Sequence, residues 1–561
     1  MLISFTQKNM KNKLKVLICS EASFLNSGFG IYNREIISRL HKTNKYDIAE
    51  FASYGFVNDP RDKDIHWTYY ANAVKNGDPR HKEYTSRADN QFGRWRFEKV
   101  LLDFRPDVVI DVRDYWMSSY QATSPLRKYF HWVLMPTVDS EPQQEEWIDT
   151  FLSADAIFTY SDWAAKVLNN QSSGKINYID TASPGVDLET FNIKNRKNIR
   201  AKFNIPQDAF VVGSVMRNQK RKLIPELLLA FRKFVDELAL INPELVSKVY
   251  LYLHTSYPDM GWDIPEILKD ARLANKVLFS NICKNCKNVS CNVFSGIHTV
   301  CPKCMNKACV FPSVTDGYET ENLAEVYNIF DLYVQYSICE GFGMPQIEAS
   351  ACGTPVATVD YSAMCDVIKK IEAYPIRIQT RFKELETKAI RVYPDNDSLA
   401  KIILDFYSLP DPMKNKIRMK TRELTEKNYD WDSVAKKWEK YLDELDNSGY
   451  RSQWSKEAEY MPEIKKFDAN TSQNFDIIMN ICQNTLQDEN LIGTKRMLDM
   501  LKNADYGYVQ GSPTQISSFS IQNTYQYFDS IVSNNNQAEN IRSENTEIEE
   551  DFIVYSKLKN Q

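Results

Sequence analysis

The chain has 561 residues, a net charge of −5 and 43% apolar residues. Because a single hydrophobic core stops growing near ~250–300 residues, this length predicts two large domains and a smaller appendage. The balanced charge is typical of a soluble globular protein and disfavours a dedicated polyanion-binding protein. No run reaches the ~18 apolar residues of a membrane-spanning helix, and the first residues show no cleavage site typical of a signal peptide. We therefore expect a cytoplasmic protein without a transmembrane segment.

The first part of the chain alternates short apolar strands with helical segments. A strand is predicted at 15–20, a polar loop with two glycines follows it, and residues 31–40 place isoleucine and leucine side chains on one helical face. Further buried strands are predicted at 106–112, 131–138 and 153–161. Strands that alternate with helices indicate a parallel, doubly wound sheet, and we assign this first domain to residues 1–205.

A second copy of the same pattern is predicted at 206–430. It opens with a strand at 209–216, a basic loop at 217–222 and a helix that carries Pro225 in its first turn, where proline is tolerated. Four later strands are predicted at 248–255, 276–280, 331–337 and 354–360. The fold class is therefore α/β, with two doubly wound domains.

The C-terminal part changes in character. Residues 431–449 place Trp431, Trp438 and several aliphatic side chains on one stripe, which predicts a docking helix. Residues 450–561 are predicted to form a helical extension with a mobile acidic end. In that extension, helices are expected at 475–486 and 494–504, and the acidic end at 533–551.

The stretch CEGFGMPQIEASACGTP, which begins at Cys339, gathers three glycines in a chain that has only 18. Its loop leads from a predicted strand into a helix that begins near Pro345, so that loop amides and a helix N-terminus together form an anion site. Two carboxylates beside that site, Glu340 and Glu348, are suited to accept hydrogen bonds from sugar hydroxyls, which predicts a nucleotide sugar as ligand. The alternative is that Glu340 caps the helix, Glu348 is solvated and the glycines only form a turn.

The run from Asp331 to Val356 resembles the E-x7-E signature of retaining GT-B-fold glycosyltransferases, and of family 4 (group 1) in particular. This resemblance implies two Rossmann-like domains that face a cleft, a nucleotide-sugar donor and the transfer of a hexosyl or pentosyl group, with no catalytic metal. It also implies that Glu340 contacts the donor sugar and Glu348 the donor ribose. The loop amides that would contact sugar or phosphate are those of Phe342, Gly343 and Met344.

The basic loop at 217–222 supplies the cations that a diphosphate leaving group needs when no metal is present. By resemblance, Arg217 and Lys222 contact the donor diphosphate. Lys220 and Arg221 compete for this role, and the loop can also be read as a solvated basic turn. The family often has glycine after the lysine, whereas this chain has leucine there.

The first domain resembles the family less closely. Gly28 and Gly30 match its glycine-rich loop, which implies an approach to the donor phosphate or the reaction centre. The family often carries a histidine after a strand of this domain, but here Asp139 is the best occupant, while His131 lies at the wrong end of the strand. Asp139 is therefore the candidate acceptor-side residue, with a loop or cap role as the alternative, and we name no general base.

Six of the eleven cysteines lie between Cys283 and Cys309, which favours a metal in a reducing compartment over disulfides. Two C-x2-C knuckles separated by fourteen residues predict a four-thiolate zinc ribbon at 281–312 that holds a structural zinc. The predicted ligands are Cys283, Cys286, Cys301 and Cys304. Cys291 and Cys309 are either spare thiols or substitutes for a knuckle cysteine. The insert carries four lysines and no acidic residue, so its surface is either simply solvated or grips a polyanionic acceptor.

Two functions follow from these patterns. The first is a retaining, nucleotide-sugar-dependent glycosyltransferase whose acceptor is a glycan, lipid, protein or modified nucleobase. The alternative is a zinc-ribbon nucleic-acid-binding protein on an inactive GT-B scaffold. The balanced charge argues against the alternative.

Overall fold

The computed structural model describes residues 13–313, 316–446, 448–460 and 509–510. The chain divides into two compact units: a terminal unit, Met1–Leu134 with Glu444–Gln561, and a central unit, Met135–Asp443. This division groups residues 135–205 with the central unit, whereas the sequence assigned them to the first domain, and the boundary at 205 stays a prediction. The helices expected at 475–486 and 494–504, and the acidic end at 533–551, lie outside the described residues.

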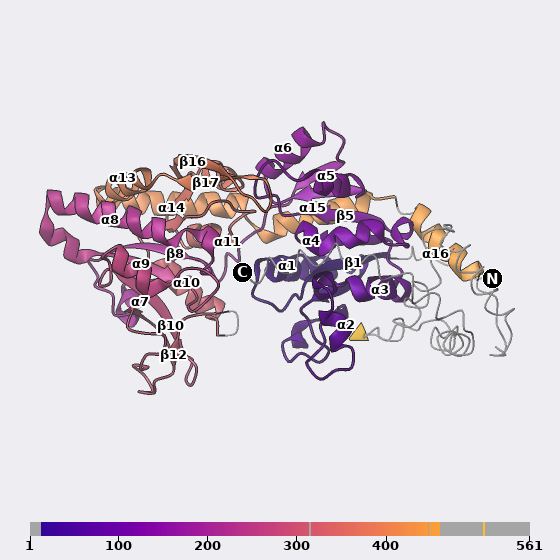
Figure 1. Cartoon of the computed structure of the whole chain (residues 1–561), viewed down its shortest axis with the longest axis horizontal. Coiled ribbons are helices and arrows are strands. Elements are labelled where there is room, and N and C mark those ends of the chain that lie inside the picture. Colours follow the sequence, from indigo (N-terminus) through magenta and orange to yellow (C-terminus); the bar gives the residue numbers. More distant parts are fainter. Residues whose placement is uncertain (1–12, 314–315, 447, 461–508, 511–561) are drawn as a thin grey trace, which may run out of the picture. The chain divides into compact units, whose positions relative to one another are not determined.

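The terminal unit contains a mainly parallel sheet with helices between its strands (Figure 1). Its strands are β1 (Leu14–Glu21), β2 (Tyr46–Ser53), β3 (Thr68–Ala71), β4 (Val108–Val112), β5 (His131–Met135) and β18 (Val509–Gln510). Its α-helices are α1 (Gly28–Lys42), α2 (His81–Thr85), α3 (Phe97–Phe104), α4 (Tyr115–Ser118) and α16 (Ser448–Tyr460). The strands follow the order β18-β3-β2-β1-β4-β5, and β1 pairs in parallel with both β2 and β4.

Helix α1 begins earlier than the apolar periodicity predicts. The hydroxyl oxygen of Ser27 accepts a hydrogen bond from the amide of Gly30 at 3.1 Å and so caps the helix. Both glycines of the expected loop therefore lie in the first helical turn. The helix buries Ile36, Ile37 and Leu40, the side chains that the sequence placed on its apolar face.

Helix α16 is anchored to the terminal unit by a buried tryptophan and an ion pair. The indole of Trp454 is 5% exposed and donates a hydrogen bond of 2.9 Å to the carbonyl oxygen of Pro106. Arg451 pairs with the carboxylate of Asp107 at 2.5 Å. The start of the predicted C-terminal extension is thus a helix packed against the residues that directly precede β4.

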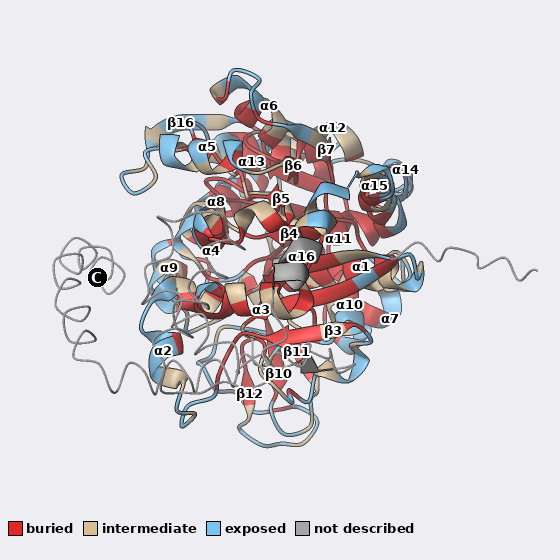
Figure 2. Ribbon diagram, turned by 90° about the vertical axis from the view of Figure 1, so that its right-hand side faces the viewer, coloured by how far each residue is buried: buried red, intermediate tan, exposed pale blue. Residues whose placement is uncertain are grey.

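The central unit is built around a second sheet, whose strands are almost all buried (Figure 2). The strands of the central unit are β6 (Ala156–Thr159), β7 (Tyr178–Thr181), β8 (Phe210–Val215), β9 (Val249–His254), β10 (Val277–Cys283), β11 (Val289–Val293), β12 (Cys309–Val310), β13 (Leu332–Gln335), β14 (Val356–Val359), β15 (Tyr374–Ile376), β16 (Ile378–Lys383) and β17 (Ile390–Pro394). Strands β6 and β7 pair in parallel with each other and do not belong to this second sheet. Its α-helices are α5 (Glu145–Leu152), α6 (Asp162–Gln171), α7 (Arg196–Lys202), α8 (Ile224–Ile241), α9 (Ile264–Asp270), α10 (Thr320–Ile329), α11 (Met344–Ala351), α12 (Met364–Ile371), α13 (Asn396–Tyr407), α14 (Asp411–Asn428) and α15 (Trp431–Glu444).

The order of this second sheet is β11-β10-β9-β8-β13-β14-β15, and all pairs from β10 to β15 are parallel. Helix α8 covers it with Leu227, Phe231 and Phe234, each fully buried. Strands β11 and β12 add to β10 in antiparallel fashion and belong to the cysteine-rich insert. The predicted α/β fold with two doubly wound sheets is confirmed.

Two further parts of the central unit stand apart from this sheet. Strands β16 and β17 form an antiparallel hairpin that the sequence analysis did not predict. Helix α15 stacks Trp438 on Phe158 of β6, with ring centroids 4.1 Å apart. Among the described residues, no helix combines the length and apolarity needed to cross a membrane.

Candidate functional site

The candidate site lies where the strand order of the second sheet reverses. From β8 the chain proceeds outward to β9 and β10, and β13 returns to the other side of β8. In open α/β sheets, ligands bind beyond the carboxyl ends of the strands at such a point. The basic loop 217–222 follows β8 and the loop 336–343 follows β13. The amide of Ile338 donates a 3.0 Å hydrogen bond to the carbonyl oxygen of Arg221, so the two predicted loops meet.

Glu340 is the centre of this meeting point. Its side chain is buried, forms an ion pair with Lys222, and accepts from Arg221 at 3.1 Å and from the Gln335 amide at 2.8 Å. Burial alone raises the pKa of the Glu340 carboxyl, but the charges of Lys222 and Arg221 outweigh it and hold that pKa at about 2. Glu340 is therefore ionised at neutral pH.

The start of α11 explains the glycines of this loop. Gly343 has φ +85°, a left-handed conformation that favours glycine, and it precedes the helix with Pro345 in the first turn. A Cβ on Gly341 would lie 2.4 Å from the Cγ2 of Thr137, so the backbone approaches a neighbouring loop closely there. No side chain caps α11, which rules out the alternative that Glu340 is its cap.

The residues beside Gly343 differ in exposure. Phe342 is buried, its ring packs on Tyr429 with centroids 5.7 Å apart, and its carbonyl oxygen accepts from the Gln346 amide at 2.7 Å. Met344 is the first residue of α11 and is half-buried. Because the first amides of a helix lack partners within it, the start of α11 can offer amides to a ligand, while the Phe342 side chain belongs to the core.

Glu348 lies one turn inside α11 and is buried, so the alternative of a solvated carboxylate is wrong. Its Oε2 accepts a hydrogen bond of 2.6 Å from the hydroxyl of Tyr327. Burial raises the pKa of Glu348 to about 7, and the Tyr327 hydrogen bond offsets only part of that effect.

The basic loop separates into two parts. Residues Lys220–Lys222 form a short 3-10 turn that brings Arg221 and Lys222 to Glu340. Arg217 is half-exposed and pairs instead with Asp259, at 2.9 and 3.0 Å. Leu223 follows with φ +45°, a left-handed conformation that suits glycine better. The structure therefore brings Arg221, which the sequence analysis named only as a competitor, beside Glu340, and it pairs Arg217 with Asp259.

Asp139 lies beside Cys339, the residue that precedes Glu340. Its Oδ1 pairs with Arg391 at 2.7 Å, and its Oδ2 accepts from the thiol of Cys339 at 3.3 Å. Arg391 comes from β17 and carries no sequence signal, since it is 252 residues from Asp139. Like Gln335 and Tyr327, it is a residue of the site that the sequence analysis did not name.

Gly28 and Gly30 lie in the first turn of α1, in the terminal unit. A Cβ on Gly30 would come within 2.5 Å of the carbonyl oxygen of Leu25, whereas one on Gly28 would meet nothing within 4 Å. Close packing therefore explains why residue 30 is glycine, independently of any ligand. A role for either glycine in donor binding stays a prediction.

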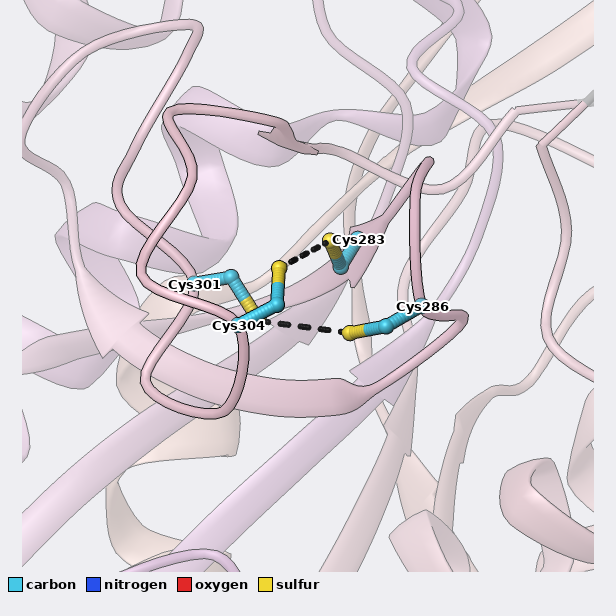
Figure 3. Close-up of side chains that lie close together, drawn as sticks. All are labelled: Cys283, Cys286, Cys301 and Cys304. Atoms are coloured by element: carbon cyan, nitrogen blue, oxygen red, sulfur yellow. Dashed lines mark hydrogen bonds between the residues drawn. The ribbon is translucent and has the colours of Figure 1, made fainter.

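The four predicted ligand cysteines converge in the insert (Figure 3). The Sγ atoms of Cys283, Cys286, Cys301 and Cys304 all lie within 4.8 Å of one another. Each knuckle closes with the same backbone hydrogen bond of 2.9 Å, one from Lys287 to Cys283 and one from Met305 to Cys301. Four sulfur atoms at this spacing suit a tetrahedral metal ion.

The two other cysteines of the insert serve as core residues. Cys291 is buried and its thiol donates to the carbonyl oxygen of Phe203 at 3.3 Å. Cys309 is buried in β12 and lies opposite Cys283 in the antiparallel pairing of β12 with β10. Neither is among the four converging sulfur atoms, and the described cysteines are all free thiols.

Parts of the chain are similar to known glycosyltransferases. The sequence model of the family described as "Glycosyl transferases group 1" matches residues 313–423, which include Glu340 and Glu348. A D-inositol 3-phosphate glycosyltransferase of Stackebrandtia nassauensis is 29% identical over 36% of this chain and 38% of its own length. A second one, from Catenulispora acidiphila, is 26% identical over 38% of this chain and 42% of its own length. The chain thus covers less than half the length of these curated relatives.

Solved structures share the fold. Sucrose-phosphate synthase from Thermosynechococcus elongatus superposes with a TM-score of 0.54 at 17% identity, over 79% of this chain and 100% of that one. Anabaena Alr3699/HepE, in complex with UDP and glucose, gives 0.50 at 13% identity, over 77% of this chain and 100% of that one. At these identities the likeness establishes the fold alone, and that fold is GT-B.

Proposed function

We propose that the chain is a retaining glycosyltransferase that moves a sugar from a nucleotide-sugar donor to an acceptor. The observation that carries this proposal is the buried cluster of Glu340 with Lys222 and Arg221 at the switch point of the second sheet. Glu340 and Glu348 both lie within the segment that matches the group 1 glycosyltransferases. A buried carboxylate that faces two cations has no evident use on an inactive scaffold, so the nucleic-acid-binding alternative gains no support.

In the proposed reaction the cations receive the leaving group. Negative charge develops on the donor diphosphate as its bond to the sugar's anomeric carbon breaks, and Lys222 and Arg221 stabilise that charge without a metal. Arg217 keeps its predicted place on the diphosphate, although its present partner is Asp259. The ionised Glu340 accepts a hydrogen bond from a sugar hydroxyl and so orients the sugar.

The configuration at the anomeric carbon is proposed to be retained because the acceptor attacks from the front face of the sugar. The acceptor oxygen forms its bond to the anomeric carbon on the side from which the diphosphate departs, and the acceptor proton passes to the departing phosphate oxygen. The protein's contribution is then positioning and charge stabilisation rather than proton transfer by a side chain. The backbone amides of Gly343 and Met344, at the start of α11, contact the sugar or phosphate, while Glu348 binds the donor ribose.

Two observations on similar proteins select the first compounds to test. Anabaena HepE was solved with UDP, so UDP-sugars are the first donors. The curated relatives are named for inositol 3-phosphate, so a phosphorylated polyol is the first acceptor. Because the match covers only part of those relatives, a glycan, lipid, protein or nucleobase acceptor is tested alongside.

We also propose that the four converging cysteines hold a structural zinc ion. The donor set is sulfur alone, which zinc binds tetrahedrally, and the amide of Lys303 donates to the Sγ of Cys301 at 3.4 Å, as is common for a metal-bound thiolate. When bound, the ion would cross-link the two knuckles of a segment too small to form its own core. No open ligand position and hence no catalytic role is proposed for it.

Donor binding is tested with a thermal-shift panel of UDP-, GDP- and ADP-sugars. The wild-type protein is expected to be stabilised by at least one of them, and Glu340→Gln to lose the part of that shift that depends on the sugar. The control is Glu423→Gln, which changes an exposed glutamate of α14 in the same unit. Equal sugar-dependent shifts in wild type and Glu340→Gln would contradict the role of Glu340.

A further inference from the structure

The β16–β17 hairpin joins the three loops of the candidate site through its backbone. The amide of Ile390 donates to the carbonyl oxygen of Glu141 at 2.8 Å, and the amide of Val392 donates to that of Ile338 at 3.3 Å. Ile338 in turn donates to the carbonyl oxygen of Arg221 at 3.0 Å. Strand β17 therefore lies between the loop that carries Asp139 and the loop that carries Glu340.

The side chain between these two amides continues the link. Only 8% of the Arg391 side chain is exposed, and its Nη1 lies 2.7 Å from the Oδ1 of Asp139 and 2.9 Å from the Sγ of Cys339. On its other edge Arg391 donates to the Oε2 of Glu384 at 3.0 and 2.9 Å. The planar guanidinium is thus fixed by two carboxylates, a geometry that lysine cannot reproduce fully.

Asp139 has little freedom left. Its Oδ1 also accepts from the hydroxyl of Ser140 at 2.9 Å, and its Oδ2 accepts from the Cys339 thiol. With both oxygens engaged, the Asp139 carboxylate is suited to hold its neighbours in place. Cys339 directly precedes Glu340, so any movement of Asp139 reaches the Glu340 carboxylate through one peptide unit.

We infer that Arg391 is a positioning residue: it anchors Asp139 and Cys339, and through them holds Glu340 against the donor sugar. Asp139 then serves as an anchor for the Glu340 loop, whereas the sequence analysis named it as the candidate acceptor-side residue. This inference rests on the proposed function. It adds Arg391, which lies outside the segment that carries Glu340 and Glu348, to the residues that support the reaction. It also gives the β16–β17 hairpin a function, which is to hold the Glu340 loop in place.

The test compares Arg391→Met, Arg391→Lys, Asp139→Asn and the double variant Arg391→Met/Asp139→Asn. The control is Lys383→Met, an exposed residue of β16 in the same hairpin. Three readouts are used: kcat for release of nucleoside diphosphate from the donor that the panel selects, the affinity for UDP by calorimetry, and hydrogen exchange of the peptide that spans 336–342. The last one needs no activity.

Arg391→Met is expected to lower kcat by about 10- to 100-fold, the range that a displacement of about 1 Å produces, while UDP affinity changes less than about twofold. Arg391→Lys is expected to recover part of kcat. The double variant should lose no more than Arg391→Met alone, because both changes break one link. Exchange at 336–342 should rise in Arg391→Met and stay at the wild-type level in Lys383→Met.

Four results would overturn the inference: wild-type kcat in Arg391→Met, an equal loss in Lys383→Met, additive losses in the double variant, or unchanged exchange at 336–342. A fall of kcat and UDP affinity together would indicate general damage and would also overturn it. If the wild-type protein turns over no donor, the proposed function fails. Exchange at 336–342 then still decides whether Arg391 orders the Glu340 loop.

Discussion

Glu348 offers a quantitative test of the buried site, because burial raises its pKa from 4.5 to about 7. Between these values the folded protein keeps a proton on Glu348 that the unfolded chain has lost. The free energy of unfolding therefore decreases as the pH rises through this window. At about 1.4 kcal/mol for each tenfold change in proton affinity, the total loss is about 3 kcal/mol.

The perturbation is Glu348→Gln, which removes the titration and leaves an oxygen that accepts the hydrogen bond of Tyr327, 2.6 Å away in the wild type. The assay is urea unfolding of both proteins at pH 5 and pH 8, followed by fluorescence. Part of the wild-type loss of unfolding free energy has already occurred at pH 5. The unfolding free energy of the variant minus that of the wild type should therefore rise by about 2 to 3 kcal/mol from pH 5 to pH 8.

Glu423→Gln serves as the control, because that glutamate is exposed. Its difference from the wild type should be the same at pH 5 and pH 8. A constant difference between Glu348→Gln and the wild type would refute the reasoning, since it would mean that Glu348 titrates alike in the folded and unfolded chain.

Three further predictions concern other parts of the molecule. Lys222→Met is expected to weaken UDP binding about tenfold or more in calorimetry, because it removes a charged hydrogen-bond donor from the diphosphate; unchanged affinity would contradict its role. Metal analysis should find about one zinc per chain in protein prepared under reducing conditions, less in Cys301→Ser, and the wild-type amount in Cys291→Ala. Trp454→Ala should lower the stability of the terminal unit by about 3 kcal/mol in urea unfolding, and Trp454→Phe by about 1 kcal/mol, since only the first empties a buried site. Equal effects of the two tryptophan variants would argue against that packing.

Much of the fold could be predicted from local patterns. The strands of both sheets are apolar runs, and their burial follows directly from that composition, as in β1 and β8. Helix α1 begins three residues before its expected start, because Ser27 caps the helix at a position that precedes the first apolar residue of the periodic pattern. The hairpin β16–β17 was missed because β16 is largely exposed and polar, β17 is only five residues long, and no short turn signal joins them.

Some residues of the candidate site could be predicted from the sequence and others could not. The carboxylates, glycines and cysteines were found because each group is compact in sequence, as with the two C-x2-C knuckles. Arg221 could be named but not ranked above Arg217, since the turn that aims it at Glu340 is a matter of three-dimensional structure. Arg391 lies 52 residues from Cys339, and only the packing of β17 between two loops brings it there.

The central claim is that the Glu340 cluster serves transfer from a nucleotide sugar, and donor turnover tests it most directly. The measurement is the release of nucleoside diphosphate from the sugar nucleotides of the binding panel, with and without the acceptor set, by the wild-type protein, Glu340→Gln and the control Glu423→Gln. The wild type and the control are expected to cleave at least one donor at the same rate, and Glu340→Gln to be slower by about 100-fold or more, because a charged contact to the reacting sugar is lost. Equal turnover by Glu340→Gln and the wild type, or no turnover of any donor by the wild type, would contradict the account.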